Sequence, residues 1–184
     1  MVHNYVPCRG KGQGATRMSD SIAALLQRVT QGVYVVGVAH GGMRNAFTAA
    51  WVMQVSFDPL LVALSINPRH SSYALLEESR AFSVNVLKRG QLELAAHFGR
   101  PARADKLAST EWTTGRTGAP LLRESLAWFE CQAVGEHAAG DHVLVLGKVI
   151  DGELLDSKAE PMTYRETGAM DGASALFPDV FGDS

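Results

Sequence analysis

Cationic and hydroxyl side chains gather in residues 66–79, INPRHSSYALLEES, where an apolar segment meets a predicted helix. Arg69 and His70 offer cationic donors, and Ser71 and Ser72 offer hydroxyl groups at the expected helix start. A helix N-terminus also presents unpaired N–H groups and partial positive charge, which favour an anion. Serine is equally common there as an ordinary helix cap. The residues alone leave two interpretations open: an anion site, or a capped helix with Arg69 in solvent.

A second group of reactive side chains lies in residues 135–142, GEHAAGDH, which hold Glu136, His137, Asp141 and His142. Their spacing suits a hairpin rather than one helical face and matches no recognisable ligand pattern, so we expect no metal site. His142 is kept as a candidate site residue, with a local hydrogen bond in a turn as the alternative. We find no convincing nucleophile and acid–base triad.

The elements that hold these residues follow from the apolar patterns. Ile22, Leu25, Leu26 and Val29 recur at helical spacing and share one face. Residues 60–66 are apolar on both faces, which predicts a central strand. Further strands are predicted at residues 33–39, 46–56, 81–87, 126–134 and 142–150, further helices at 71–79 and 90–98, and an irregular connection at 99–125.

The order of these elements indicates the fold class. Several predicted strands follow one another without a helix, so the strand–helix alternation of a doubly wound parallel sheet is missing. The pattern favours a mainly β fold, an antiparallel barrel with helices packed outside it. We expect a flexible N-terminal extension at residues 1–17, one domain at 18–160 and a C-terminal tail at 161–184.

Composition argues against two classes of partner. The formal net charge is −2, so the chain lacks the surplus of Lys and Arg that nucleic-acid binding requires. Nor does any apolar stretch approach the roughly 20 residues of a membrane-spanning helix. Cys8 and Cys131 match no metal spacing, and reduced thiols in a cytoplasmic protein are the simplest interpretation.

Motifs along most of the chain occur in an order that resembles the flavin reductase-like family. Residues 45–79, NAFTAAWVMQVSFDPLLVALSINPRHSSYALLEES, are similar to that family's Thr-Ala-Ser segment, strand turn and Arg-His-Thr/Ser helix start. AFSVNVL and QLELAAHFG (81–87 and 91–99) resemble its next strand and helix, and HAAGDHVLVLGKV (137–149) resembles its Gly-Asp-His strand entry. Each motif alone is weak, but their common order and spacing are specific.

The resemblance implies a six-stranded, FMN-binding split barrel that forms a homodimer. The phosphate of FMN is then expected at Arg69, His70, Ser71 and Ser72. The flavin ring is expected at two strand segments, which comprise Thr48, Ala49, Ala50, Trp51, Ser65, Ile66 and Asn67. Trp51 suits a flavin contact and core packing equally well, and Phe98 borders the flavin unless it only packs in the core. His142 is expected on the nicotinamide side.

The implied activity is NAD(P)H-dependent flavin reduction, with hydride passing from NADH or NADPH to bound FMN; FAD and riboflavin are alternative flavins. Reduced flavin is then expected to serve a partner monooxygenase or to reduce a ferric chelate. The alternative is a non-enzymatic FMN-binding electron-transfer protein that works with a protein partner. Two departures from the family matter: Ala50 replaces a serine, and the tail offers only Tyr164 where the family often has a tyrosine-containing strand. We expect this tail to cover the nicotinamide side or to dock a partner.

Overall fold

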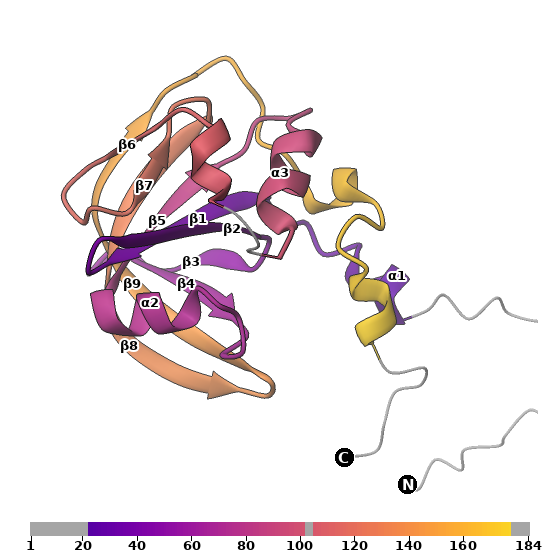
Figure 1. Ribbon diagram of the computed structural model, residues 1–184. Helices are drawn as coiled ribbons and strands as arrows, with labels where there is room; N and C mark the ends of the chain where they lie inside the picture. Colours follow the sequence, from indigo (N-terminus) through magenta and orange to yellow (C-terminus); the bar gives the residue numbers. More distant parts are fainter. Residues whose placement is uncertain (1–21, 102–104, 178–184) are drawn as a thin grey trace, which may run out of the picture.

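One antiparallel sheet carries most of the chain that the computed structural model describes, residues 22–101 and 105–177. Its seven strands lie in the order β2-β1-β5-β8-β9-β4-β3 (Figure 1). They are β1 Tyr34–His40, β2 Met43–Ala49, β3 Val52–Ser56, β4 Leu61–Ile66, β5 Ala81–Val86, β8 Ala127–Ala139 and β9 His142–Leu154. The helix α2, Tyr73–Ser79, packs on β1 and β5, and α3, Leu92–Gly99, packs on β1 and β2. The predicted mainly β fold with peripheral helices is confirmed.

The segment predicted as one strand at residues 46–56 forms two strands, and the break between them closes the barrel. β2 and β3 lie at opposite edges of the sheet, yet only Ala50 and Trp51 connect them. The three Cα–Cα steps from Ala49 to Val52 span about 11 Å at most, so these ends of the two edge strands lie close together. The Val52 amide donates to the Ala50 carbonyl (3.1 Å) and the Ser65 amide to the Trp51 carbonyl (2.9 Å). This break is why six predicted strands become seven.

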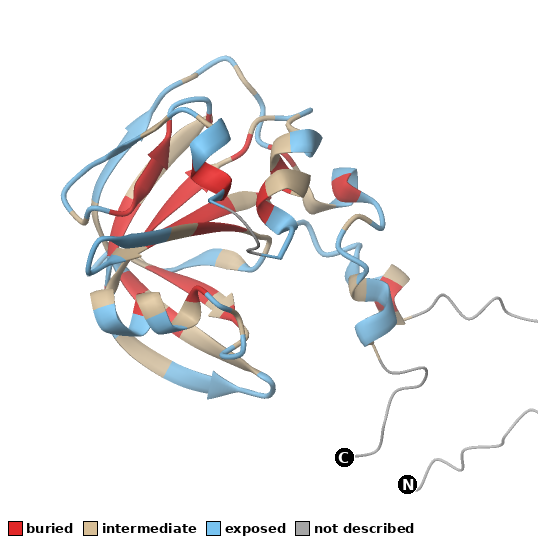
Figure 2. Ribbon diagram, viewed as in Figure 1, coloured by how far each residue is buried: buried red, intermediate tan, exposed pale blue. Residues whose placement is uncertain are grey.

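The sheet separates two apolar clusters. Figure 2 shows the buried strands that contribute to these clusters in red and the exposed outer loops in pale blue. Val36 and Phe82 belong to the cluster that also holds Leu76 of α2. Val35, the neighbour of Val36 on β1, faces the other cluster with Phe98 of α3. Successive side chains of a strand point to opposite faces, so β1 supports both clusters.

The first helix ends earlier and is less buried than its pattern predicts. The described part of α1 spans Ile22–Leu26, so Val29 lies beyond its end. Three residues of the predicted apolar face are exposed: Leu25 by 45%, Leu26 by 47% and Val29 by 55%. The periodicity was correct about an apolar face, but the barrel does not cover that face. Across the described residues, no helix reaches the length and hydrophobicity of a membrane-spanning segment.

Residues 99–125 contain more order than the predicted irregular connection. The 3-10 helix η1, Lys106–Ser109, precedes a small antiparallel sheet of β6, Trp112–Thr114, and β7, Pro120–Leu122. Asn85 on β5 fixes β7, because its side-chain amide donates to the Val35 carbonyl (2.9 Å) and accepts from the Leu122 amide (2.7 Å). Buried Glu130 accepts from the backbone amides of Arg116 and Thr117 at 2.7 and 2.8 Å. These hydrogen bonds join residues that are far apart in the sequence, so no periodic pattern predicts them.

The hairpin of β8 and β9 is longer than predicted. Each strand has 13 residues, so most of the predicted connection 135–141 pairs within the ladder and only Gly140 and Asp141 form the turn. Register shifts between Glu130 and Cys131 and between Ala133 and Gly135 interrupt the alternation along β8. Figure 1 shows this hairpin, in orange, reaching past α2. Its tip brings His142 to the barrel opening.

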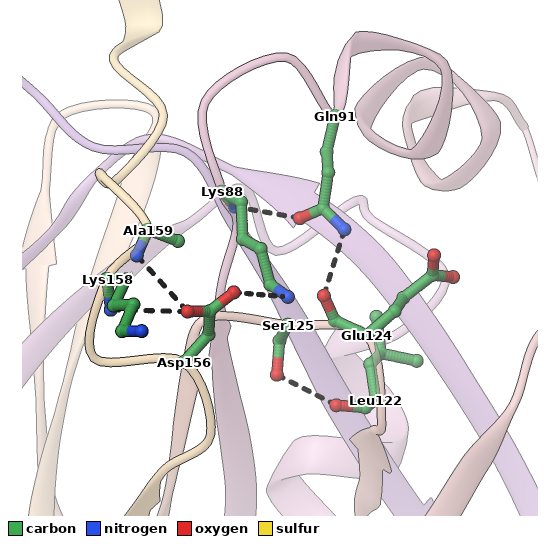
Figure 3. Close-up of polar contacts among 8 residues, drawn as sticks. All are labelled: Lys88, Gln91, Leu122, Glu124, Ser125, Asp156, Lys158 and Ala159. Carbon is green, nitrogen blue, oxygen red and sulfur yellow. Dashed lines mark hydrogen bonds and ion pairs between the residues drawn. The ribbon is translucent and has the colours of Figure 1, made fainter.

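The C-terminal segment is fastened to the barrel rather than loosely attached. The Lys88 ammonium donates to the Asp156 carboxylate at 3.1 Å, and Gln91 connects the Lys88 amide to the Glu124 carbonyl (Figure 3). Asp156 also accepts from the backbone amides that follow it. Met162, 1% exposed, then enters the second cluster. These contacts deliver the next residues of the tail to the candidate site. The predicted extension 1–17 and residues 178–184 of the tail lie outside the described residues.

Candidate functional site

Nine of the thirteen residues proposed from the sequence line one cavity of about 230 Å³ at the barrel closure. This main cavity is lined by Phe47, Thr48, Ala49, Ala50, Trp51, Ser65, Ile66, Asn67, His70, His142, Tyr164, Asp171 and Ala173. The lining comes from the end of β2, the end of β4 and its following turn, the tip of the β8–β9 hairpin, and the tail. The fold thus joins segments that are far apart in the sequence.

Small side chains form one wall of the main cavity. Ala49 ends β2 and Ala50 follows it, so only methyl groups separate a bound molecule from the backbone there. Trp51 is 46% exposed, and its ring lies 5.0 Å from the His142 ring at 59°. The Trp51 side chain is therefore a wall of the cavity and not part of the core.

The turn after β4 presents polar groups at one end of the main cavity. The Asn67 side chain accepts from the Arg69 amide at 2.9 Å, and His70 Nδ1 accepts from the Ser72 amide at 3.2 Å. Burial, with a smaller contribution from the nearby ammonium of Lys106, lowers the pKa of His70. The lowered pKa favours the neutral imidazole over the cationic His70 expected from the sequence, and Nε2 is the ring nitrogen left to donate because Nδ1 accepts from Ser72.

Arg69, Ser71 and Ser72 do not line the main cavity, although they adjoin His70. Arg69 and Ser71 are exposed, whereas Ser72 is fully buried and its hydroxyl accepts from the side-chain amide of Asn45 at 3.0 Å. Ser72 occupies the N-cap position of α2 but makes no side-chain cap bond. The predicted position of a serine cap is thus confirmed, but its side-chain cap bond is absent, and the hydroxyl instead contacts Asn45 on β2.

Phe98 also lies away from the main cavity. Its side chain is fully buried and packs in the second apolar cluster with Leu107 and Met162. Of the two roles considered for Phe98, core packing is the one this position supports.

The hairpin tip places a hydrogen-bonded His–Asp pair at the mouth of the main cavity. His142 Nδ1 lies 2.8 Å from an oxygen of Asp141, and this contact lowers the pKa of Asp141, with a smaller effect from Arg69. Glu136 instead binds the Tyr73 hydroxyl (3.1 Å) and the Arg80 guanidinium (2.7 Å), which holds α2 against β8. Within the ranges described, no three His, Cys, Asp or Glu side chains form a group suited to a metal.

The tail supplies a wall of the site that the sequence only partly indicated. The Tyr164 hydroxyl donates to the Asp171 carboxylate at 2.6 Å, and burial and this carboxylate raise the pKa of Tyr164 to about 12. Tyr164 is the only tyrosine of the tail, and this was the one feature of the sequence that pointed to it as a site residue. Nothing in the sequence marked Asp171, Ala173 or Phe47.

A second cavity, of about 400 Å³, adjoins the main cavity beneath the C-terminal end of α3. Its lining includes Arg100 and Met170, and it shares Thr48, Ala49 and Ala50 with the main cavity. Together the two cavities offer room for a ligand larger than either volume alone, within the range of small-molecule sites.

Comparison with known proteins identifies the family. The family model described as the flavin reductase like domain matches residues 26–173. The chain belongs to the flavin reductase-like family. The NADH:FAD oxidoreductase SgcE6 of Streptomyces globisporus superposes with a TM-score of 0.71 at 30% identity, covering 76% of this chain and 83% of that one.

Among related sequences of this family, FMN reductase (NADH) RutF 1 of Methylorubrum extorquens is 32% identical over 77% of this chain and 70% of its own. Actinorhodin polyketide dimerase of Streptomyces coelicolor is 32% identical over 85% of this chain and 89% of its own. Other relatives are much longer. The chain spans 27% of diflavin flavoprotein A 1 of Synechocystis and 38% of a probable flavin reductase of Rhizobium meliloti.

Proposed function

We propose that this protein is an NAD(P)H:flavin oxidoreductase that binds FMN in the main cavity. The observation that carries the proposal is the convergence of residues from four separate segments on that cavity. The flavin ring lies against Ala49, Ala50 and Trp51, and the FMN phosphate lies toward Arg69, His70 and Ser71. Membership of the flavin reductase-like family supports the cofactor.

The protein's own residues bind and orient in this proposal. When bound, the nicotinamide and the flavin supply the hydride transfer, which needs their reacting atoms about 3–3.5 Å apart. Trp51 and His142 border the open side of the main cavity, and in this proposal they position the nicotinamide there. Tyr164, held protonated beside Asp171, offers its phenol as a wall from the tail. Ala50, in place of the family's serine, removes one hydrogen bond of about 1 kcal/mol to the flavin.

We also propose that two copies of the chain form a homodimer through β3. This edge strand exposes Met53 and Val55 by 61% and 42%, and the turn that follows it exposes Phe57 and Leu60 by 89% and 44%. An unpaired edge with large apolar side chains favours association with another chain. A second copy offers the same apolar surface, so the contact is self-complementary about a two-fold axis.

Reduced flavin made in the cytoplasm would serve a separate enzyme in this proposal. A relative in the solved structures is the flavin reductase component of a bacterial two-component tryptophan halogenase, which supports delivery to an oxygen-using partner. A monooxygenase is the partner class we propose for this chain, with a ferric chelate as the alternative acceptor.

Anaerobic stopped-flow mixing tests the proposed activity. Purified protein loaded with FMN is expected to lose its yellow absorbance on mixing with NADH or NADPH under nitrogen. Protein that binds FMN but is not bleached by either nucleotide would instead be an electron carrier. Protein that does not bind FMN, FAD or riboflavin would exclude both functions.

A further inference from the structure

Two arginines line a small polar pocket away from the main cavity. This arginine pocket has a volume of about 280 Å³ and is lined by Gln27, Arg28, Val29, Thr30, Gln31, Thr163 and Arg165. All of these residues except Val29 have polar side chains, and the two charged ones, Arg28 and Arg165, are both positive. Guanidinium groups with nearby amides and hydroxyls are the donors that bind phosphate.

Backbone hydrogen bonds join the two segments that carry these arginines, both of which are exposed. The Tyr164 amide donates to the Gln31 carbonyl at 2.8 Å, and the Val33 amide to the Met162 carbonyl at 3.0 Å. Gly32 and Thr163 form an antiparallel bridge between these bonds. Arg28 therefore precedes, and Arg165 directly follows, a paired stretch of backbone. The pocket is built on a fixed frame.

The two guanidinium groups lack a compensating carboxylate among the described residues. Arg44, Arg80 and Arg89 each form an ion pair, but Arg28 and Arg165 form none with any residue in the described ranges. Glu166 directly follows Arg165 in the sequence, but its carboxylate accepts hydrogen bonds from the backbone amide and the hydroxyl of Thr163. Two like charges beside one pocket repel each other, and an anion between them removes that repulsion.

A third cavity, beneath α1, shares lining residues with both the arginine pocket and the main cavity. This α1 cavity has a volume of about 220 Å³ and shares Trp51, Tyr164 and Ala173 with the main cavity. It shares Gln27, Val29 and Gln31 with the arginine pocket. Figure 1 shows α1 beside the yellow C-terminal turns, which include η3, Ala173–Leu176, that flank this path. The three hollows form one series along the tail.

We propose that Arg28 and Arg165 bind a phosphate group of the nicotinamide nucleotide whose reacting ring lies in the main cavity. This site rests on the proposed reductase function, which puts such a nucleotide at the start of the series. The phosphate belongs to one of two sources: the 2′-phosphate, present in NADPH only, or the diphosphate that NADH and NADPH share.

Steady-state kinetics of Arg28→Gln, Arg165→Gln and the double variant test the site. Each single change is expected to raise the KM about tenfold, with kcat within about twofold, because it removes one charge-assisted contact to the phosphate. An effect on NADPH alone identifies the 2′-phosphate, and an equal effect on both nucleotides identifies the diphosphate. Arg123→Gln, a change at an exposed arginine in the loop between β7 and β8, is the matched control and should leave KM unchanged. Unchanged KM values in the double variant overturn the site.

Calorimetry separates failure of this site from failure of the reductase function, because it needs neither flavin nor turnover. Adenosine 2′,5′-bisphosphate and ADP are titrated into the full chain and into the double variant. Binding of either compound to the unchanged chain and its loss in the double variant support the site, even if no flavin is reduced. Equal heats in the two proteins, or no binding to the unchanged chain, overturn it.

Discussion

Arg69→Ala should weaken the binding of FMN but not that of riboflavin. The two ligands differ only in the phosphate group. Arg69 is exposed in the turn before α2 and forms no ion pair among the described residues, although it acts on Asp141 through space. A unit charge about 4 Å away contributes about 1 kcal/mol in water and about 4 kcal/mol near a protein surface. Because the side chain is exposed, we expect a loss of about 1–3 kcal/mol.

That loss corresponds to FMN binding about 5- to 150-fold more weakly, with riboflavin affinity changed by less than about twofold. Flavin fluorescence titration of both ligands measures this difference. Raising the ionic strength from 0.1 to 1 M should reduce the preference for FMN in the unchanged protein more than in the variant. Arg123→Ala is the control for a general loss of surface charge. Equal losses for the two ligands, or no loss of FMN affinity, would refute the phosphate role of Arg69.

Three further changes address the dimer, the core and the turn. Phe57→Asp should halve the mass seen by sedimentation velocity, whereas Leu154→Asp, at an exposed site on β9, should not; a monomeric unchanged protein would exclude the β3 dimer. Gly147→Ala should lower the free energy of unfolding in urea by about 1–3 kcal/mol, because its Cβ would lie 2.5 Å from Phe82; unaltered stability contradicts this. The pKa of His70 is lowered from 6.5 on folding, so the unfolded chain binds more protons and stability falls as the pH drops below about 6.5. His70→Asn should flatten that fall between pH 5 and 6.5 in urea titrations, and an identical slope in the variant argues against it.

Local patterns predicted the elements that local forces determine. The apolar run at residues 60–66 predicted a central strand, and β4 does lie between β9 and β3; the buried pattern of β5 was equally clear. The motif order identified the family, and nine candidate residues reached one cavity. Short-range spacing and a resemblance were enough for these conclusions.

Long-range contacts decided what the sequence did not predict. Ser72 lies at the N-cap of α2 as predicted, but its hydroxyl accepts from the side chain of Asn45, on a strand far earlier in the chain, and makes no cap bond. The break at Ala50 and Trp51 was hidden inside a continuous strand-like pattern, because it depends on where the two sheet edges meet. Periodicity describes which face is apolar, and it carries no information on which segment will cover that face.

The amino-acid sequence by itself predicted most strands of the large sheet, the helices α2 and α3, and nine of the residues that line the main cavity. Only the tertiary structure decided that Tyr164 and Asp171 of the tail form a wall of the main cavity, and that Phe98 packs in the core. The physical reason is the range of the interactions. Hydrogen bonding within a turn and side-chain alternation act over a few residues, whereas barrel closure and the docking of the tail depend on the packing of the whole chain.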